Sequence, residues 1–226
     1  IYSVNSFPMC PTLFIIIEAF DAFLTMTSIL HSILSIEFLV GSSNDSFLEV
    51  ANLSIWNEVP AIAQDPSGFL FVNEGNLYRQ INKSYQNEFD KIIDSGLYDE
   101  LVEKELLIPH EESNVESSQP EKCYKIIKPK FIDFISYPYE WSFNQLKDAA
   151  LTTLEIQKIA MDYGLTLKDC SAYNVQFLNG KPIFIDTLSF EIYQEGQFWK
   201  PYRQFCQHFL SPLALMNHKD IRLNQL

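Results

Sequence analysis

The feature that most constrains this chain is a short hairpin near its C-terminal end, flanked by polar side chains. Two apolar runs, residues 175–178 and 182–185, are separated by Asn179-Gly180-Lys181. Asn-Gly between two such runs is a strong hairpin signal, because both residues tolerate a positive φ angle. The two runs are therefore predicted to pair as antiparallel strands.

The hairpin brings polar side chains to one end of its ribbon. Asn174 precedes the first strand and Asp186 follows the second. Their side chains offer hard oxygen ligands suited to Mg²⁺, which usually keeps water and substrate phosphates as its other ligands. Asp169 lies in the loop before the hairpin, where a carboxylate could accept or orient the proton of a substrate hydroxyl. The structural alternative is that Asp169 and Asn174 form turns and Asp186 caps a strand.

This segment resembles the catalytic segment of the protein kinase superfamily, including its aminoglycoside and choline kinase branches. Those families use D-x-x-x-x-N followed by a metal-binding Asp, and Asp169, Asn174 and Asp186 match in type and order. The resemblance implies that Asp169 is the catalytic carboxylate, that Asn174 and Asp186 are metal ligands, and that ATP and Mg²⁺ are the cofactors.

The segment departs from the kinase pattern at two places. Leu167 stands where the family has a His, and Thr187-Leu188 stands where it has Phe-Gly. These departures bear on whether the segment is catalytically active more than on whether the fold is kinase-like. An active phosphotransferase, an inactive nucleotide-binding module and a structural or partner-binding domain without nucleotide therefore all remain open.

The residues before this loop predict a central helix and two strands. Ser142 is a plausible N-cap, and apolar residues recur at helical spacing until Gly164. Upstream, residues 124–130 and 131–137 predict strands that lead into an aromatic run at 138–141. In the kinase interpretation this run is the hinge where adenine would dock; otherwise it is an ordinary strand followed by an aromatic turn.

Further upstream, the sequence predicts a second hairpin and two helices. Residues 68–72 and 76–81 flank Asn73-Glu74-Gly75, which is typical of a hairpin. In the kinase interpretation it occupies the place of the hairpin that covers the phosphates. Residues 85–94 and 97–105 then predict two helices.

Three residues of this region are candidates for nucleotide binding. Arg79, inward-facing by strand alternation, is the first candidate for a phosphate-binding cation, and Lys125 is the second. Glu88, on the first helix, could pair with that cation. The alternative for Arg79 is an exposed side chain on a hairpin.

Together these elements predict an α+β, two-lobed protein-kinase-like fold. A small antiparallel sheet lobe is expected at residues 67–137 and a mainly helical lobe at 138–226. An apolar N-terminal extension is expected at 1–66. It has neither a basic signal-peptide region nor a clean apolar run of about 18 residues, so we expect no membrane span there. It is either a segment that packs on the small lobe or a stretch outside the true reading frame.

Composition excludes several classes of function. The formal charge of −13 argues against nucleic acid or an anionic membrane as a main partner. The seven glycines are too dispersed for a Rossmann, Walker or SAM-binding loop. The four cysteines form no C-x-x-C motif, which favours a reduced, cytoplasmic setting, and Cys170 is expected to pack rather than to react. The acidic, serine-rich residues 111–120 are predicted to be a solvated loop.

A second resemblance concerns the wider chain. Residues 134–143, 167–191 and 202–215 resemble the N-terminal part of bacterial proteins named class I SAM-dependent methyltransferases, related to a nodulation methyltransferase. The resemblance implies that the chain is a fragment and that SAM binds only in a downstream methyltransferase domain absent from it. The expected function is that of a transferase, by phosphotransfer to a small-molecule or carbohydrate acceptor or by nucleotide binding. The alternative is an inactive interaction module.

Overall fold

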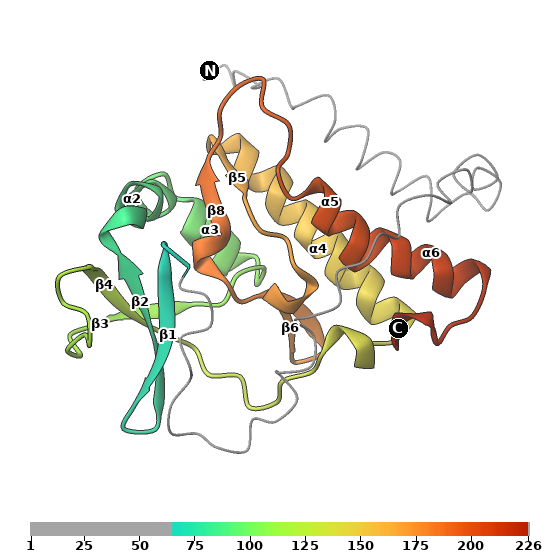
Figure 1. Cartoon of the computed structure of the whole chain (residues 1–226), viewed down its shortest axis with the longest axis horizontal. Helices are drawn as coiled ribbons and strands as arrows, with labels where there is room; N and C mark the ends of the chain where they lie inside the picture. The colour runs from blue at the N-terminus through green and yellow to red at the C-terminus, as the bar shows by residue number, and fades with distance from the viewer. Residues whose placement is uncertain (1–64, 226) are drawn as a thin grey trace. The chain divides into compact units, whose positions relative to one another are not determined.

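A four-stranded antiparallel sheet forms the first part of the fold (Figure 1). The computed structural model describes residues 65–225. The strands are β1 (Gly68–Asn73), β2 (Asn76–Asn82), β3 (His110–Ser113) and β4 (Cys123–Pro129), in the spatial order β1-β2-β4-β3. The predicted extension at 1–66 lies almost wholly outside the described residues.

The β1–β2 hairpin is confirmed, and its turn uses the residues that the sequence offers for it. Glu74 and Gly75 have φ angles of 49° and 75°. Both lie in the left-handed region, which glycine adopts with the least steric strain. At the other end of β1, Gly68 lies against the next strand and a later segment of the chain. A Cβ there would stand 2.0 Å from the Gln80 carbonyl oxygen and 2.8 Å from Leu188 Cδ1. The strand therefore packs closely against the residues that follow β7.

Two helices, α2 (Gln86–Asp94) and α3 (Leu97–Glu103), connect β2 to β3 and confirm the predicted pair. Gly96 separates them with a φ of 89°. Each helix turns a few apolar side chains inward, and these belong to the fully buried core. They are Phe89, Ile92, Leu97 and Leu101.

The helix α4 (Phe143–Asp162) is the longest element and is confirmed with its predicted start and end. Ser142 and Gln145 form a capping box in which each side chain accepts a hydrogen bond from the other residue's backbone N–H. Gly164, with a φ of 72°, turns the chain into β5 (Leu165–Leu167). That strand pairs with β8 (Phe190–Ile192) and leads directly into the loop that carries Asp169.

The predicted hairpin forms as β6 (Val175–Leu178) and β7 (Lys181–Phe184). Asn179 and Gly180 make the turn with φ angles of 53° and 78°. Main-chain hydrogen bonds also tie β7 to the segment after α3. Phe184 donates to Leu106 O and accepts from Ile108 N, each at 2.8 Å.

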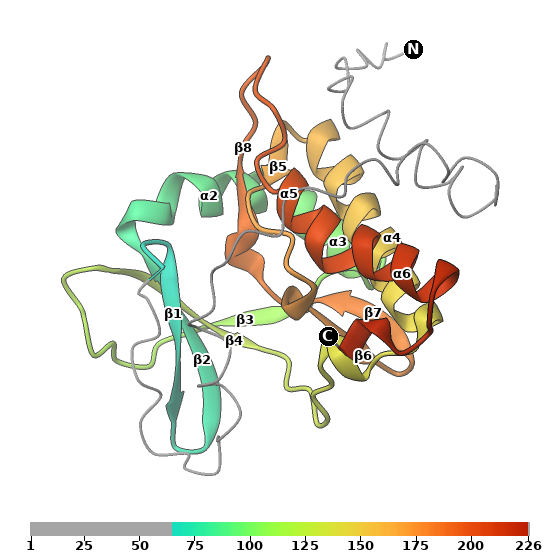
Figure 2. The ribbon, with the colours of Figure 1, turned by 45° about the vertical axis from the view of Figure 1, so that its right-hand side comes forward.

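The chain ends in a helical run that lies beside α4 (Figure 2). Its parts are α5 (Tyr202–Phe205), a π-helical segment (Cys206–Leu210) and α6 (Ser211–His218). Short 3-10 turns complete the structure. They are Lys83–Tyr85, Pro138–Glu140, Ala172–Asn174, Thr187–Ser189 and Leu223–Gln225.

One sequence prediction about local structure is wrong, and a second is wrong only at its start. Residues 131–137 form no strand, because β4 already ends at Pro129 and most of the following apolar side chains are exposed to solvent. The predicted loop at 111–120 begins instead as strand, since Glu111 and Glu112 pair with β4. An edge strand leaves such acidic side chains in water, so their polarity did not preclude pairing.

The described residues thus form a mixed α+β fold with small antiparallel sheets and several helices. By their contacts, the residues from Asp65 onward group as one compact unit. The division into lobes at 67–137 and 138–226 stays a prediction. None of the helices described between residues 65 and 225 is long and apolar enough to cross a membrane.

Candidate functional site

The centre of the candidate site is an ion pair between the sheet and the β6–β7 hairpin. Arg79 Nη1, from β2, contacts Asp186 Oδ1, just beyond the end of β7. The two side chains are only 16% and 18% exposed. The alternative of an exposed Arg79 on a hairpin is therefore wrong. Burial lowers the pKa of the Arg79 guanidinium to about 10, which leaves it charged at neutral pH.

Asp186 has further partners close to it in sequence. Its Oδ1 accepts a hydrogen bond from Leu188 N at 3.1 Å, and its Oδ2 accepts one from Ser189 Oγ at 2.6 Å. Asp186 thereby caps the 3-10 turn Thr187–Ser189. The carboxylate is held by one cation and two hydrogen-bond donors, so its orientation is strongly fixed.

Asn174 lies beside Asp186, as the hairpin predicted. Its backbone oxygen accepts from Ile185 N at 2.8 Å, and its Nδ2 lies 3.2 Å from Ser189 Oγ. One hydroxyl thus bridges the two predicted metal ligands.

Asp169 lies in the turn between β5 and β6. Its Oδ1 accepts from Ser171 N at 2.9 Å, which closes an Asx turn. A helical residue distant in sequence also reaches this turn. His208 Nδ1, from the π-helical segment, lies 3.2 Å from both Ser171 Oγ and Ala172 N.

The strand before Asp169 is fixed by a buried side chain of α4. Gln157 Oε1 accepts from Leu167 N at 2.7 Å, and Gln157 Nε2 donates to Thr166 Oγ1 at 2.9 Å. Gln157 is 1% exposed. A buried amide with these partners sets where β5 ends, and therefore where Asp169 begins its turn.

Lys168 is a cation of this region that sequence reasoning missed. Its Nζ donates to Ser67 Oγ at 2.6 Å and lies 4.5 Å from the centroid of the Tyr85 ring. Burial lowers the pKa of Lys168, while nearby carboxylates, Asp65 first and Glu88 next, oppose that shift. Glu88 therefore acts on Lys168 electrostatically, whereas Arg79 pairs with Asp186 rather than with Glu88.

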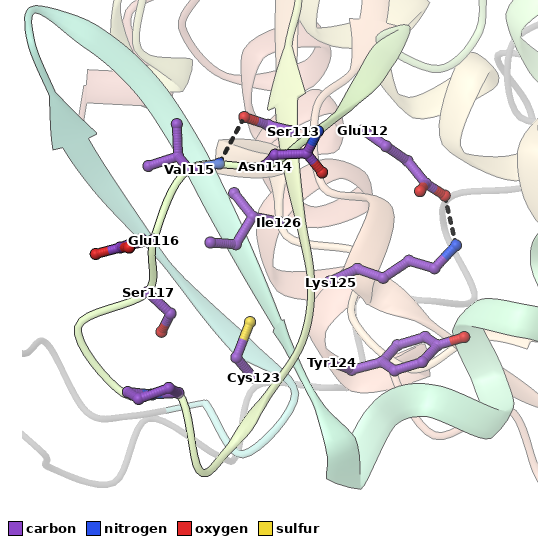
Figure 3. A pocket seen from close by; sticks show the side chains of 11 residues that line it. Glu112, Ser113, Asn114, Val115, Glu116, Ser117, Cys123, Tyr124, Lys125 and Ile126 are labelled. Atoms are coloured by element: carbon purple, nitrogen blue, oxygen red, sulfur yellow. Dashed lines mark hydrogen bonds and ion pairs between the residues drawn. The ribbon is translucent and has the colours of Figure 1, made fainter.

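Lys125 lies elsewhere. It forms an ion pair with Glu112 across β3 and β4, and both residues line a pocket of about 640 Å³ beside the acidic loop (Figure 3). That pocket includes none of Asp169, Asn174 and Asp186. The structure thus places Arg79, the first candidate for a phosphate-binding cation, at the end of the β6–β7 hairpin. It places Lys125, the second candidate, elsewhere.

Cys170, next to Asp169, is part of the core. It is fully buried, its backbone N–H donates to Gln204 Oε1 at 2.8 Å, and its Sγ lies 3.3 Å from Pro201 O. Burial raises the pKa of the Cys170 thiol far above neutrality. The thiolate needed for nucleophilic attack is absent at neutral pH, in agreement with the packing role expected from sequence.

The arrangement offers few ligands for a metal ion. Within residues 65–225, no group of three or more His, Cys, Asp or Glu side chains is placed to hold one. Asn174 and Asp186 could supply two ligating side chains. That number fits Mg²⁺, which keeps several waters, but Asp186 Oδ1 would first have to leave Arg79.

Sequence reasoning missed Gln157, Ser189, His208 and Gln204 besides Lys168. Ser189 had a partial signal, because Asp186 is a typical N-cap residue whose carboxylate can accept hydrogen bonds from the residues that follow it. His208 and Gln204 had none, since they lie more than thirty positions after the residues that they contact. The roles of Asp169, Arg79, Glu88, Lys125, Asn174 and Asp186 in binding or catalysis stay predictions.

The chain was compared with known proteins once its geometry was defined. No family model matches the chain. Over 160 residues the chain is 36% identical to the nodulation protein NoeA of Rhizobium meliloti (strain 1021). The match covers 70% of this chain and 33% of NoeA, so the chain spans about a third of the length of the curated relative that it matches.

Proposed function

We propose that residues 65–225 form a kinase-like module that binds a magnesium nucleotide within a larger transferase. The observation that carries this proposal is the meeting of Arg79, Asn174 and Asp186 at the end of the β6–β7 hairpin. A guanidinium from the sheet and two oxygen-bearing side chains from the hairpin form a suitable donor set for a phosphate chain with Mg²⁺.

Each residue has a proposed role. Asn174 and Asp186 would hold Mg²⁺, which supplies charge neutralisation for the phosphates when bound. Arg79 would exchange the Asp186 carboxylate for phosphate oxygens, since the planar guanidinium matches both kinds of acceptor. Asp169 would orient the hydroxyl of a small-molecule or carbohydrate acceptor.

A second candidate is an inactive interaction module that binds no nucleotide. The contacts of Asp186 favour it, because Arg79, Leu188 N and Ser189 Oγ already satisfy the carboxylate. In this case the polar cluster stabilises the junction of sheet and hairpin, and the module acts by contact with a partner.

The larger protein is proposed to be a methyltransferase. The similarity to the nodulation protein NoeA and the sequence resemblance described above support this proposal. The dispersed glycines of this chain provide no SAM-binding loop, so SAM would bind in another part of the protein. A downstream methyltransferase domain would then be the partner of the module.

Calorimetric titration of ATP tests the two candidates. For the magnesium nucleotide module we expect ATP to bind more tightly with Mg²⁺ than without it. Binding should be lost in Asp186→Ala and retained in Asp162→Ala, which removes an exposed carboxylate at the end of α4. Absence of ATP binding by the folded wild-type protein would contradict the proposal and support the interaction module.

An ATP turnover assay then distinguishes a catalytically active site from one that only binds nucleotide. If Asp169 orients the acceptor, Asp169→Asn should abolish ATP turnover while leaving ATP binding intact. Asp133→Asn, which changes an exposed carboxylate elsewhere, serves as the control. Binding without turnover in the wild type would assign the region to nucleotide binding alone.

A further inference from the structure

The turn that carries Asp169 is held from outside by the C-terminal helical run. His208 Nδ1 lies 3.2 Å from Ala172 N and 3.2 Å from Ser171 Oγ. A backbone N–H can only donate, so Nδ1 is the acceptor and the neutral ring carries its proton on Nε2. His208 is therefore defined in both orientation and tautomer by the turn that it contacts.

A second side chain of the same helical run contacts the same turn. Gln204 Oε1 accepts from Cys170 N at 2.8 Å. Gln204 is in α5, and His208 follows in the π-helical segment. Such π-helical turns occur mostly as short interruptions of α-helices and often at functional sites. Two side chains of one helical run thus accept hydrogen bonds from the two backbone N–H groups that flank Ser171.

His208 also lies against an aromatic side chain of the same turn. The ring of Tyr173 lies edge-on to it, with 6.3 Å between ring centroids. Burial lowers the pKa of His208 and the carboxylate of Asp169 opposes that shift, so the ring and Asp169 interact electrostatically without an ion pair between them.

We propose that His208 is a positioning residue for Asp169. By accepting the Ala172 N–H it fixes the turn of residues 169–174, and with it the direction of the Asp169 carboxylate, without contacting a ligand itself. Its effect on catalysis rests on the proposed function, whereas its effect on the turn does not. Catalytic side chains must be held close to their productive geometry, and hydrogen bonds from neighbouring residues provide this constraint.

A pair of substitutions separates positioning from packing. His208→Asn keeps an acceptor near the place of Nδ1 but loses ring volume, whereas His208→Phe keeps a ring but has no acceptor. If His208 only packs, the Phe variant should be the better tolerated. If His208 positions the turn, His208→Asn should be the better tolerated variant.

Amide hydrogen exchange measures this in the absence of nucleotide. We expect the Ala172 N–H to exchange about tenfold faster in His208→Phe than in the wild type, and close to the wild-type rate in His208→Asn. Equal protection in the Phe variant, or equal loss in both variants, would overturn the proposal. Since the readout needs no ATP, a failure of nucleotide binding would overturn the proposed function alone.

Two measurements keep the proposal testable where a variant does not fold. In the wild type, the ¹⁵N shifts of the His208 ring should report the tautomer with its proton on Nε2, and a proton on Nδ1 would overturn the proposal. Gln204→Leu should speed exchange of the Cys170 N–H while Ala172 stays protected.

Where turnover is detected, a kinetic test also applies. His208→Phe should lower kcat about tenfold with an unchanged KM for ATP, and His208→Asn should restore kcat.

Discussion

Asn174 and Asp186 share a single hydroxyl group. Ser189 Oγ donates to Asp186 Oδ2 at 2.6 Å and lies 3.2 Å from Asn174 Nδ2. Ser189 is 1% exposed, so water does not readily replace it. The two residues predicted to bind a metal are therefore joined through a buried third residue that belongs to neither strand of the hairpin.

Ser189→Ala should destabilise the protein by about 2 kcal/mol, because the partly buried Asp186 carboxylate loses a donor. Urea unfolding would measure the change in the free energy of unfolding. Ser118→Ala, at an exposed position, is the matched control and should be nearly neutral. An effect no larger than that of the control would mean that the carboxylate finds another donor.

Arg79→Met should cost about 3 kcal/mol, since it leaves the Asp186 carboxylate largely buried without its cation. Arg203→Met, which removes an exposed cation, should change stability by less than about 0.5 kcal/mol. The double variant Arg79→Met, Asp186→Leu should recover much of the loss, because no unpaired charge remains. A double variant as unstable as Arg79→Met would show that the arginine stabilises the junction by packing instead.

Gly68→Ala should cost about 2 kcal/mol, because its Cβ would collide with the Gln80 carbonyl and with Leu188. Gly196→Ala is the control for backbone conformation alone. Gly196 has a φ of 83° with no atom within 4 Å of its would-be Cβ, so its replacement should cost about 1 kcal/mol. Thermal unfolding of both variants compares the two costs, and a smaller loss at Gly68 would contradict close packing there.

His110 should make the protein less stable in acid. Burial lowers its pKa to about 4, and its Nδ1 has no hydrogen-bond partner in the described structure. Because the unfolded chain binds this proton near pH 6.5, the stabilisation is complete above pH 6.5 and is lost as the pH falls toward 4. Unfolding at a series of pH values should show a shallower decline for His110→Leu than for the wild type. His218→Leu, which removes an exposed histidine, is the matched control.

Local signals in the sequence predicted much of this fold. Both hairpins followed from Asn and Gly at their turns, and α4 followed from Ser142 and Gly164. The run at 131–137 was misjudged because apolar content alone cannot show whether a strand has a neighbour to pair with. An element with no partner leaves its backbone hydrogen bonds to water and does not form.

The candidate site was predictable only where its residues are close in sequence or on paired strands. The hairpin register placed Asn174 beside Asp186. The partner of Arg79 was not predictable, because its contact depends on how the sheet packs against the hairpin, 107 positions later in the chain. His208 escaped notice for the same reason, since no periodicity links a C-terminal helix to a distant turn.

The hydrogen bonds between Phe184 and residues 106 and 108 have a mechanical consequence. They join the β6–β7 hairpin to the connection between α3 and β3. The sheet and the hairpin therefore cannot move apart as rigid bodies without breaking main-chain hydrogen bonds. A ligand that binds Asp186 Oδ1 must displace the Arg79 guanidinium that contacts this oxygen. Access to the carboxylate should therefore be governed by the motion of one side chain, on a faster timescale than domain closure.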